Sequence, residues 1–97
     1  MSFHNEQTSY LKTGLSDLQG AWTLLRSEVV EHFGFPKSDK ILFHIDEAMS
    51  WECVRDLKRM MGVLLVIRNI SVQSEVPDSI KHLIGDVYEC LADLDLT

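Results

Sequence analysis

Eight consecutive residues, from Met60 to Ile67, form the longest run without a polar side chain in this sequence, and they restrict the fold more than any other feature. Arg59 and Arg68 bound the run on its two sides. If the run is helical, the period of 3.6 residues places apolar atoms all round the helix, which is typical of a buried central helix or an interface helix. We therefore expect the other segments to cover this helix.

Two other segments carry a single apolar stripe each. The first stripe consists of Leu11, Leu15, Leu18, Trp22, Leu25 and Val29, and the second of Ile80, Leu83, Ile84, Val87, Leu91 and Leu94. Because steps of three and four residues return to the same side of an α-helix, each stripe predicts an amphipathic helix. Gly34 and Pro36 end the first helix, and Pro77 suits the first turn of the last one. The start of the first helix remains open between Asn5 and Ser16.

The segment from Asp39 to Ser71 contains no proline and has apolar residues at helical spacing throughout. One helix of this length would measure about 50 Å at about 1.5 Å per residue, whereas a compact domain of this size is roughly 25 Å across. Ser50 is the best candidate for a break, because its hydroxyl can cap a new helix that begins at Trp51. Both a continuous helix and a broken one remain open.

These patterns predict an all-α fold in which residues 1–97 form a single domain. We expect an antiparallel bundle of three long helices, or of four if the middle helix breaks near Ser50. A small sheet is the alternative, because residues 41–45 and 63–72 are rich in β-branched and aromatic side chains. The helical fold is favoured, since no Asn-Gly or Asp-Gly turn joins these runs.

Composition excludes several classes of function. The net charge is −6, which argues against a broad nucleic-acid surface built from clustered Lys and Arg. The first residues have neither the basic nor the apolar region of a secretory signal, and the longest apolar run is far shorter than the roughly 20 residues that span a bilayer. Cys53 and Cys90 are then expected to be reduced thiols. A cytoplasmic protein is the resulting expectation.

The sequence offers no motif for catalysis. It has no glycine-rich phosphate loop, no nucleophile elbow and no paired-cysteine site, so we nominate no catalytic residue, no metal ligand and no cofactor. Three histidines stand one helical turn from a carboxylate, in the pairs Glu28–His32, His44–Glu47 and Asp78–His82. Such pairs are common on solvated helix surfaces, and that interpretation is favoured over a metal site.

Two sets of basic residues are candidates for a nucleic-acid site. Arg26 and His32 have a spacing that loosely resembles the arginine-to-histidine motif of small helical ribonucleases, in which the cation steadies phosphate and the imidazole moves a proton. Arg55, Lys58 and Arg59 form a basic cluster with acidic residues between them. We favour ordinary helix surface for both sets, because the match is limited to two residues and the chain is acidic.

The last predicted helix carries a run of acidic residues, Asp86, Glu89, Asp93 and Asp95, with no basic residue after Lys81. These carboxylates form a solvated face, a patch for a basic partner, or a partner for the basic cluster of the same chain. We expect a small acidic, non-catalytic binding or regulatory protein, comparable to inhibitor or immunity proteins. The alternative is a ligand-binding or metal-binding protein, or an enzyme, with a site between helices that uses His32, His44 or Glu47.

A homodimer is expected from the apolar run itself. Two amphipathic helices leave part of the central helix bare, and soluble monomers seldom expose an apolar strip of several hundred Å². We expect a second copy to cover Met61, Leu65 and Val66. The monomeric alternative is that the segment from Ile41 to Met49 folds back as a fourth wall of the bundle.

Overall fold

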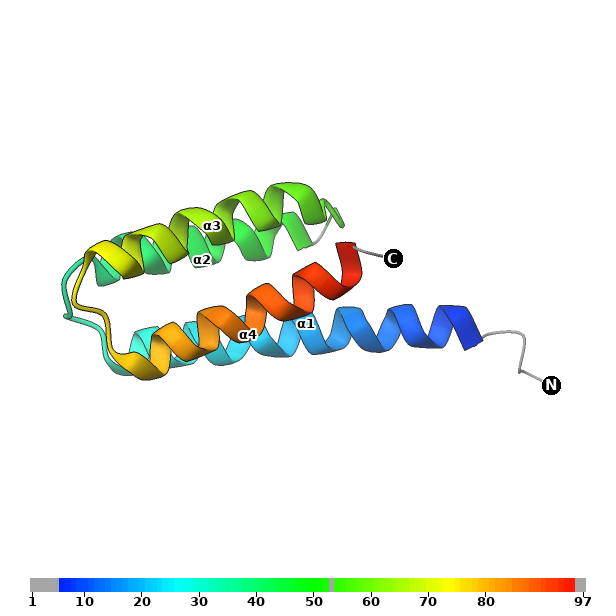
Figure 1. The fold of residues 1–97 in the computed structure, drawn as a ribbon, viewed down its shortest axis with the longest axis horizontal. Helices are drawn as coiled ribbons and strands as arrows, with labels where there is room; N and C mark the ends of the chain where they lie inside the picture. The colour runs from blue at the N-terminus through cyan, green and yellow to red at the C-terminus, as the bar shows by residue number, and fades with distance from the viewer. Residues whose placement is uncertain (1–5, 53, 96–97) are drawn as a thin grey trace.

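The computed structural model of this chain describes the backbone of residues 6–52 and 54–95, and the side chains of residues 14–51 and 54–94. This part of the chain folds into four α-helices: α1 (Glu6–Glu31), α2 (Ser38–Glu52), α3 (Leu57–Gln73) and α4 (Asp78–Asp95). Successive helices run in opposite directions (Figure 1), and no strand occurs among the described residues. The predicted all-α antiparallel bundle is therefore confirmed, in its four-helix form.

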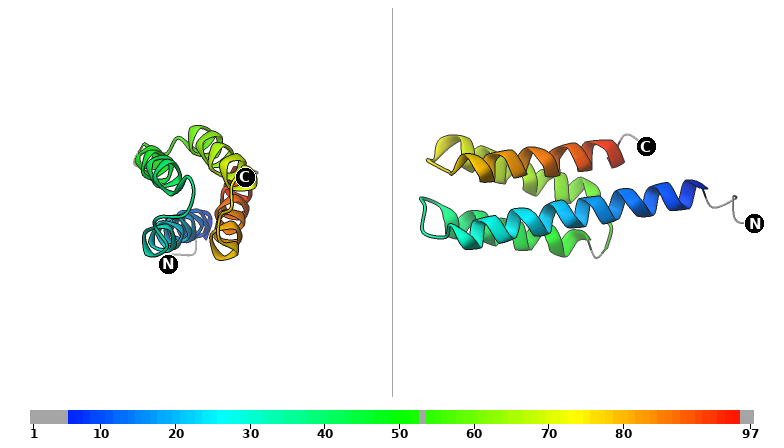
Figure 2. Two further views of the ribbon diagram at one scale, coloured as in Figure 1. Left: turned by 90° about the vertical axis from the view of Figure 1, so that its left-hand side faces the viewer. Right: turned by 90° about the horizontal axis from the view of Figure 1, so that it is seen from below.

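The helices form a ring around one core. Helix α1 packs on α2 and α4, and α3 packs on the same two helices from the other side. The view along the bundle in Figure 2 shows this square arrangement. Helix α3, which contains the long apolar run, is therefore flanked by α2 and α4 of the same chain.

The core is built from one stripe of each helix. Its buried apolar residues are Leu18, Trp22, Leu25 and Val29 of α1, Ile41, Ile45 and Ala48 of α2, Met60, Leu64 and Ile67 of α3, Ile80, Ile84, Val87, Leu91 and Leu94 of α4, and Val76 before α4. The indole N–H of Trp22 donates a hydrogen bond to the sulfur of Met60 at 3.1 Å. The stripes predicted for α1 and α4 thus line the core, although the side chain of Leu11 lies outside the described residues.

The middle segment breaks, but the predicted cap is wrong. The Ser50 hydroxyl donates to the Glu47 carbonyl at 2.6 Å within α2, so it does not cap a new helix. Helix α3 starts after Asp56, whose carboxylate accepts the N–H of Arg59 at 3.1 Å. Arg55 has a φ of 58°, in the left-handed region, and turns the chain between the two helices. The break therefore lies a few residues after the position expected from Ser50.

Helix α2 supplies the fourth wall of the bundle. Ile41, Ile45 and Ala48 are buried in the core, whereas Leu42 and Met49 are half-buried. The core is therefore closed within one chain. The homodimer is predicted from the sequence on the ground that two helices leave part of the central helix uncovered. Because α2 covers that part, this ground no longer holds.

Two glycines, one within α1 and one just after it, allow a close approach or an unusual backbone conformation. Gly34 follows the helix with a φ of 118°, as expected for a residue that ends it. Its N–H donates to the hydroxyl of Ser38 at 3.1 Å, so this buried serine ties the turn to the start of α2. A Cβ atom at Gly14 would lie 2.8 Å from a methyl carbon of Leu94, so this glycine lets α4 pack closely on α1.

Candidate functional site

Four carboxylates from two helices lie around Cys90. The side chain of Cys90 is half-buried against the core. Burial raises the pKa of its thiol, and the negative charges of Asp17, Asp86, Asp93 and Glu89 raise it further. The acidic residues predicted on α4 are therefore joined by Asp17 of α1, which sequence spacing alone did not connect to them. We call Asp17, Asp86, Glu89 and Asp93 the acidic cluster.

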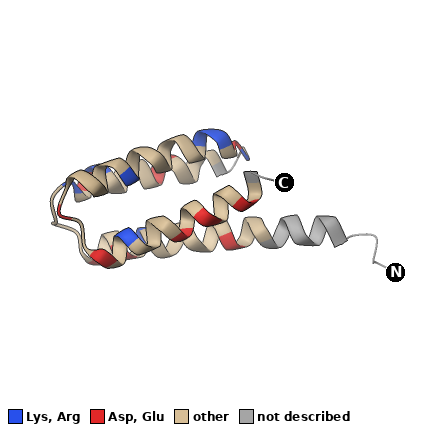
Figure 3. Cartoon of the chain, in the orientation of Figure 1, with Lys and Arg blue, Asp and Glu red and all other residues tan. Residues whose placement is uncertain are grey.

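The acidic cluster has no basic partner among the described side chains. The ion pairs in this part of the chain join Arg26 to Asp46, His32 to Glu28, His44 to Glu47 and Arg59 to Asp56. Figure 3 shows acidic positions along α4 and basic ones at the start of α3. Arg59 is held by Asp56 at 3.5 Å, so it does not neutralise α4. The side chain of Asp95 lies outside the described residues.

An exposed leucine lies on α1 next to this cluster. Asp17, Leu24 and Glu31 are seven residues apart, so they share one stripe of the helix, and Asp17 marks the side that borders α4. Leu24 is 62% exposed. An apolar side chain is therefore exposed on the stripe of α1 that also carries Asp17 and Glu31.

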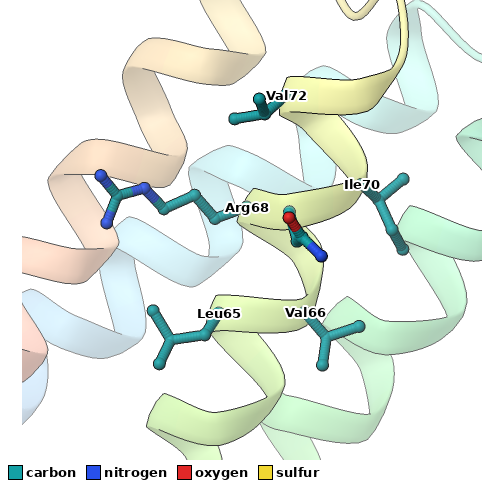
Figure 4. A pocket seen from close by; sticks show the side chains of 6 residues that line it. Leu65, Val66, Arg68, Ile70 and Val72 are labelled. Atoms are coloured by element: carbon teal, nitrogen blue, oxygen red, sulfur yellow. The ribbon is translucent and has the colours of Figure 1, made fainter.

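The outer face of α3 exposes the second half of the apolar run. Leu65 and Val66 are each about half exposed, and Val72 is 71% exposed. Figure 4 shows Leu65, Arg68 and Val72 along one side of the helix and Val66 and Ile70 along the other. Met61, the third residue predicted at a dimer interface, packs against the core instead. We call Leu65, Val66 and Val72 the α3 outer row.

A groove of about 350 Å³ lies between α2 and α3. It is lined by His44, Glu47, Trp51, Arg59, Gly62, Val63 and Val66. Nδ1 of His44 lies 3.0 Å from a carboxylate oxygen of Glu47, and the guanidinium of Arg59 lies 4.7 Å from the ring centre of Trp51. The structure therefore brings together two residues of the predicted inter-helix site, His44 and Glu47, and adds Arg59 and Gly62.

The other candidate pairs remain on separate parts of the surface. Arg26 binds Asp46 of α2 at 2.7 Å, and this hydrogen bond raises the pKa of the guanidinium. The ring of His32 instead lies 3.1 Å from the Glu28 carbonyl oxygen. Arg26 and His32 are thus each engaged with another residue, which gives no support to a shared phosphate site. Among the described residues, no three His, Cys, Asp or Glu side chains form a group suited to a metal ion.

Comparison of this chain with protein-family models, with curated proteins and with solved structures gives no match. None of the described helices is long and apolar enough to cross a bilayer. Functional inference therefore starts from the three surfaces described above: the acidic cluster, the α3 outer row and the groove between α2 and α3.

Proposed function

We propose that this protein is a non-catalytic binding protein that presents the acidic cluster of α1 and α4 to a basic protein partner. The observation that carries this proposal is that the charges of Asp17, Asp86, Glu89 and Asp93 all act on Cys90, while none of the four forms an ion pair with a described side chain. Like charges repel each other, and no ion pair of the described residues offsets this repulsion in the acidic cluster. A basic partner would relieve this repulsion.

The exposed Leu24 adds a contact of a different kind to the same side of the bundle. Interfaces commonly surround an apolar anchor with polar residues that exclude water and set the specificity. Charge complementarity mainly accelerates association and rejects wrong partners, while the apolar anchor slows dissociation. The partner that fits has a basic surface with an apolar recess, as expected for the target of an inhibitor or immunity protein that neutralises a basic protein.

The test is a capture experiment with a charge-matched control. Wild-type protein and the variant Asp86→Asn, Glu89→Gln, Asp93→Asn are immobilised, and proteins retained from a lysate of the source cells are identified. The control variant Asp39→Asn, Glu75→Gln, Asp78→Asn has the same change in net charge on exposed positions outside the cluster. We expect one basic protein to bind wild type and the control and to be lost with the cluster variant.

The captured partner is then purified, and its affinity is measured by calorimetry at several salt concentrations. The proposal predicts that affinity falls steeply as salt rises, because exposed charge pairs are screened. Leu24→Ala should accelerate dissociation more than it slows association. Equal binding by the cluster variant and the control, or an affinity independent of salt, would refute the acidic cluster as the binding surface.

A second proposal concerns self-association through the α3 outer row. The core is complete without a second copy, yet Leu65, Val66 and Val72 remain exposed on one helix. Because the core does not need these residues, their apolar character supports a contact outside the monomer. A two-fold axis beside α3 would pair the row with its copy, which is the commonest symmetry of homo-oligomers.

Sedimentation equilibrium over micromolar concentrations tests this second proposal. A dimer of the 11.1 kDa chain that dissociates in the variant Val66→Glu without loss of helicity would support it. Leu24→Glu is the matched control, since it places the same charge at an exposed apolar position of α1. A monomer at all concentrations would refute the dimer and leave the first proposal untouched.

A further inference from the structure

The groove between α2 and α3 combines an apolar wall with fixed polar groups. Trp51, Val63 and Val66 supply the apolar surface. Its volume of about 350 Å³ lies at the lower end of the range of roughly 300–1,000 Å³ typical of small-molecule sites. The groove therefore has room for a small ligand such as a single ring with a short substituent.

Arg59 is the cation of this groove, and its exposed side chain makes two contacts. Its Nε atom lies 3.5 Å from the carboxylate of Asp56, and its guanidinium lies over the Trp51 ring. Neither contact occupies the two terminal nitrogens, which can bind a carboxylate through two parallel hydrogen bonds. Arg59 also belongs to the first turn of α3, where the helix dipole favours an anion.

Two carboxylates lie at or beside the groove, and each is engaged with another residue: Glu47 with His44, and Asp56 with the Nε atom of Arg59. Glu47 is hydrogen-bonded to His44 at 3.0 Å and lies on α2, one turn before Trp51. Helix α3 itself carries Lys58, Arg59 and Arg68 and no acidic residue. The terminal nitrogens of Arg59 therefore offer a negative group its hydrogen-bond donors at the α3 end of the groove, and the apolar wall favours a ring beside it.

Gly62 keeps the groove open. A Cβ atom at this position would meet no other atom within 4 Å, so the fold does not require glycine for lack of space. Glycine destabilises a helix interior relative to alanine, so its presence at this position is not explained by helix propensity. A larger residue at this position would extend into the groove without disturbing the core.

We propose that this groove binds a small aromatic carboxylate, with the carboxylate on Arg59 and the ring against Trp51, Val63 and Val66. This binding activity is separate from the contact of the acidic cluster with a protein partner. It shares one residue, Val66, with the α3 outer row, so a second copy on that row would compete with the ligand.

Phenylacetate, phenylacetamide and acetate are the probes. Their binding is followed by two-dimensional ¹H–¹⁵N NMR at the Trp51 indole and the Gly62 amide. We expect phenylacetate to shift both signals saturably, while acetate leaves them unchanged and phenylacetamide binds about tenfold more weakly because it cannot form charge-assisted hydrogen bonds with Arg59. Arg59→Gln should weaken phenylacetate binding by about the same factor.

Gly62→Leu should abolish binding, because its side chain fills the groove. Gly20→Leu is the matched control, since Gly20 is also a helical glycine with open space around its Cβ position, and it should bind phenylacetate as wild type does. Circular dichroism confirms that both variants fold. Failure to saturate at millimolar phenylacetate, equal binding of phenylacetamide, or shifts that follow protein concentration without ligand would overturn the proposal, the last by assigning the groove to a second copy.

Discussion

The helix pairs α1/α4 and α2/α3 share one core but present different surfaces to solvent. On α1 and α4, the exposed positions include Asp17, Asp86, Glu89 and Asp93, together with the apolar side chain of Leu24. On α2 and α3, exposed positions include Phe43, Val66 and Val72, beside the Trp51–Arg59 contact. Packing of the core therefore determines which residue types occupy the inner stripe of every helix. It does not determine the residue types on the outer face.

This difference separates residues that are needed for folding from residues that are available for binding. In α4, nearly every large apolar residue lies on the buried stripe, so its outer carboxylates are not explained by packing. In α3, Met60, Leu64 and Ile67 suffice for the core, so Leu65 and Val66 are apolar without being buried. The outer carboxylates of α4 and the exposed apolar residues of α3 both support contacts with other molecules.

The largest expected effect tests this separation within the apolar run. Leu64→Ala should lower the free energy of unfolding by about 2–5 kcal/mol, the range for a leucine in a core. Leu65→Ala, on the exposed side of the same turn, should cost less than about 1 kcal/mol. Urea unfolding of the two variants measures the contrast, and equal losses would show that the outer row is buried in the folded protein.

Hydrophobic spacing was sufficient to predict the bundle. Leu18, Trp22, Leu25 and Val29 are buried as their steps of three and four require. The middle segment could not be resolved in this way, because its apolar residues are frequent enough to fit a continuous helix. Both Ser50 and Asp56 are chemically able to cap a helix, and spacing cannot choose between them. In the structure, Arg55 adopts a left-handed conformation in the turn and Asp56 caps α3.

The second expected effect therefore tests where α3 begins. Asp56→Ala should destabilise the protein by about 1 kcal/mol, because the N–H of Arg59 loses its acceptor. The exposed ion pair between the same two side chains adds little, since solvent screens it. Ser50→Ala should change stability by less than about 0.5 kcal/mol. If thermal unfolding shows a larger loss of stability for Ser50→Ala than for Asp56→Ala, the helix break lies at Ser50 and not at Asp56.

The surface sites were predicted less completely than the fold. Asp86, Glu89 and Asp93 were found because they follow one another along one helix, and their role in binding remains a prediction. Asp17 was missed, since it is distant in sequence and joins them only when α1 packs on α4. Arg59 was assigned to a salt-bridged surface, and its stacking on Trp51 depends on the turn between α2 and α3. Residues that join a site through contacts between helices thus cannot be identified from spacing along one helix.

The smallest expected effect tests the convergence of α1 and α4 on Cys90. A raised pKa leaves less of the thiol as thiolate at any given pH, and the thiolate is the form that reacts. Removing nearby negative charge lowers the pKa toward its ordinary value, so the alkylation rate at mildly alkaline pH should rise. In a Cys53→Ser background, Asp86→Asn with Asp93→Asn should therefore accelerate the reaction of Cys90 with iodoacetamide by a few fold.

Asp17→Asn should act in the same direction, although Asp17 lies on another helix, and this is the variant that probes the packing of α1 on α4. Asp39→Asn with Asp78→Asn removes two charges that do not contribute to the raised pKa of Cys90, and its rate should match the background. All accelerations should shrink in high salt, which screens exposed charges. If Asp17→Asn leaves the rate unchanged while the α4 variant raises it, the acidic cluster is confined to α4, and the proposed binding surface loses its contribution from α1.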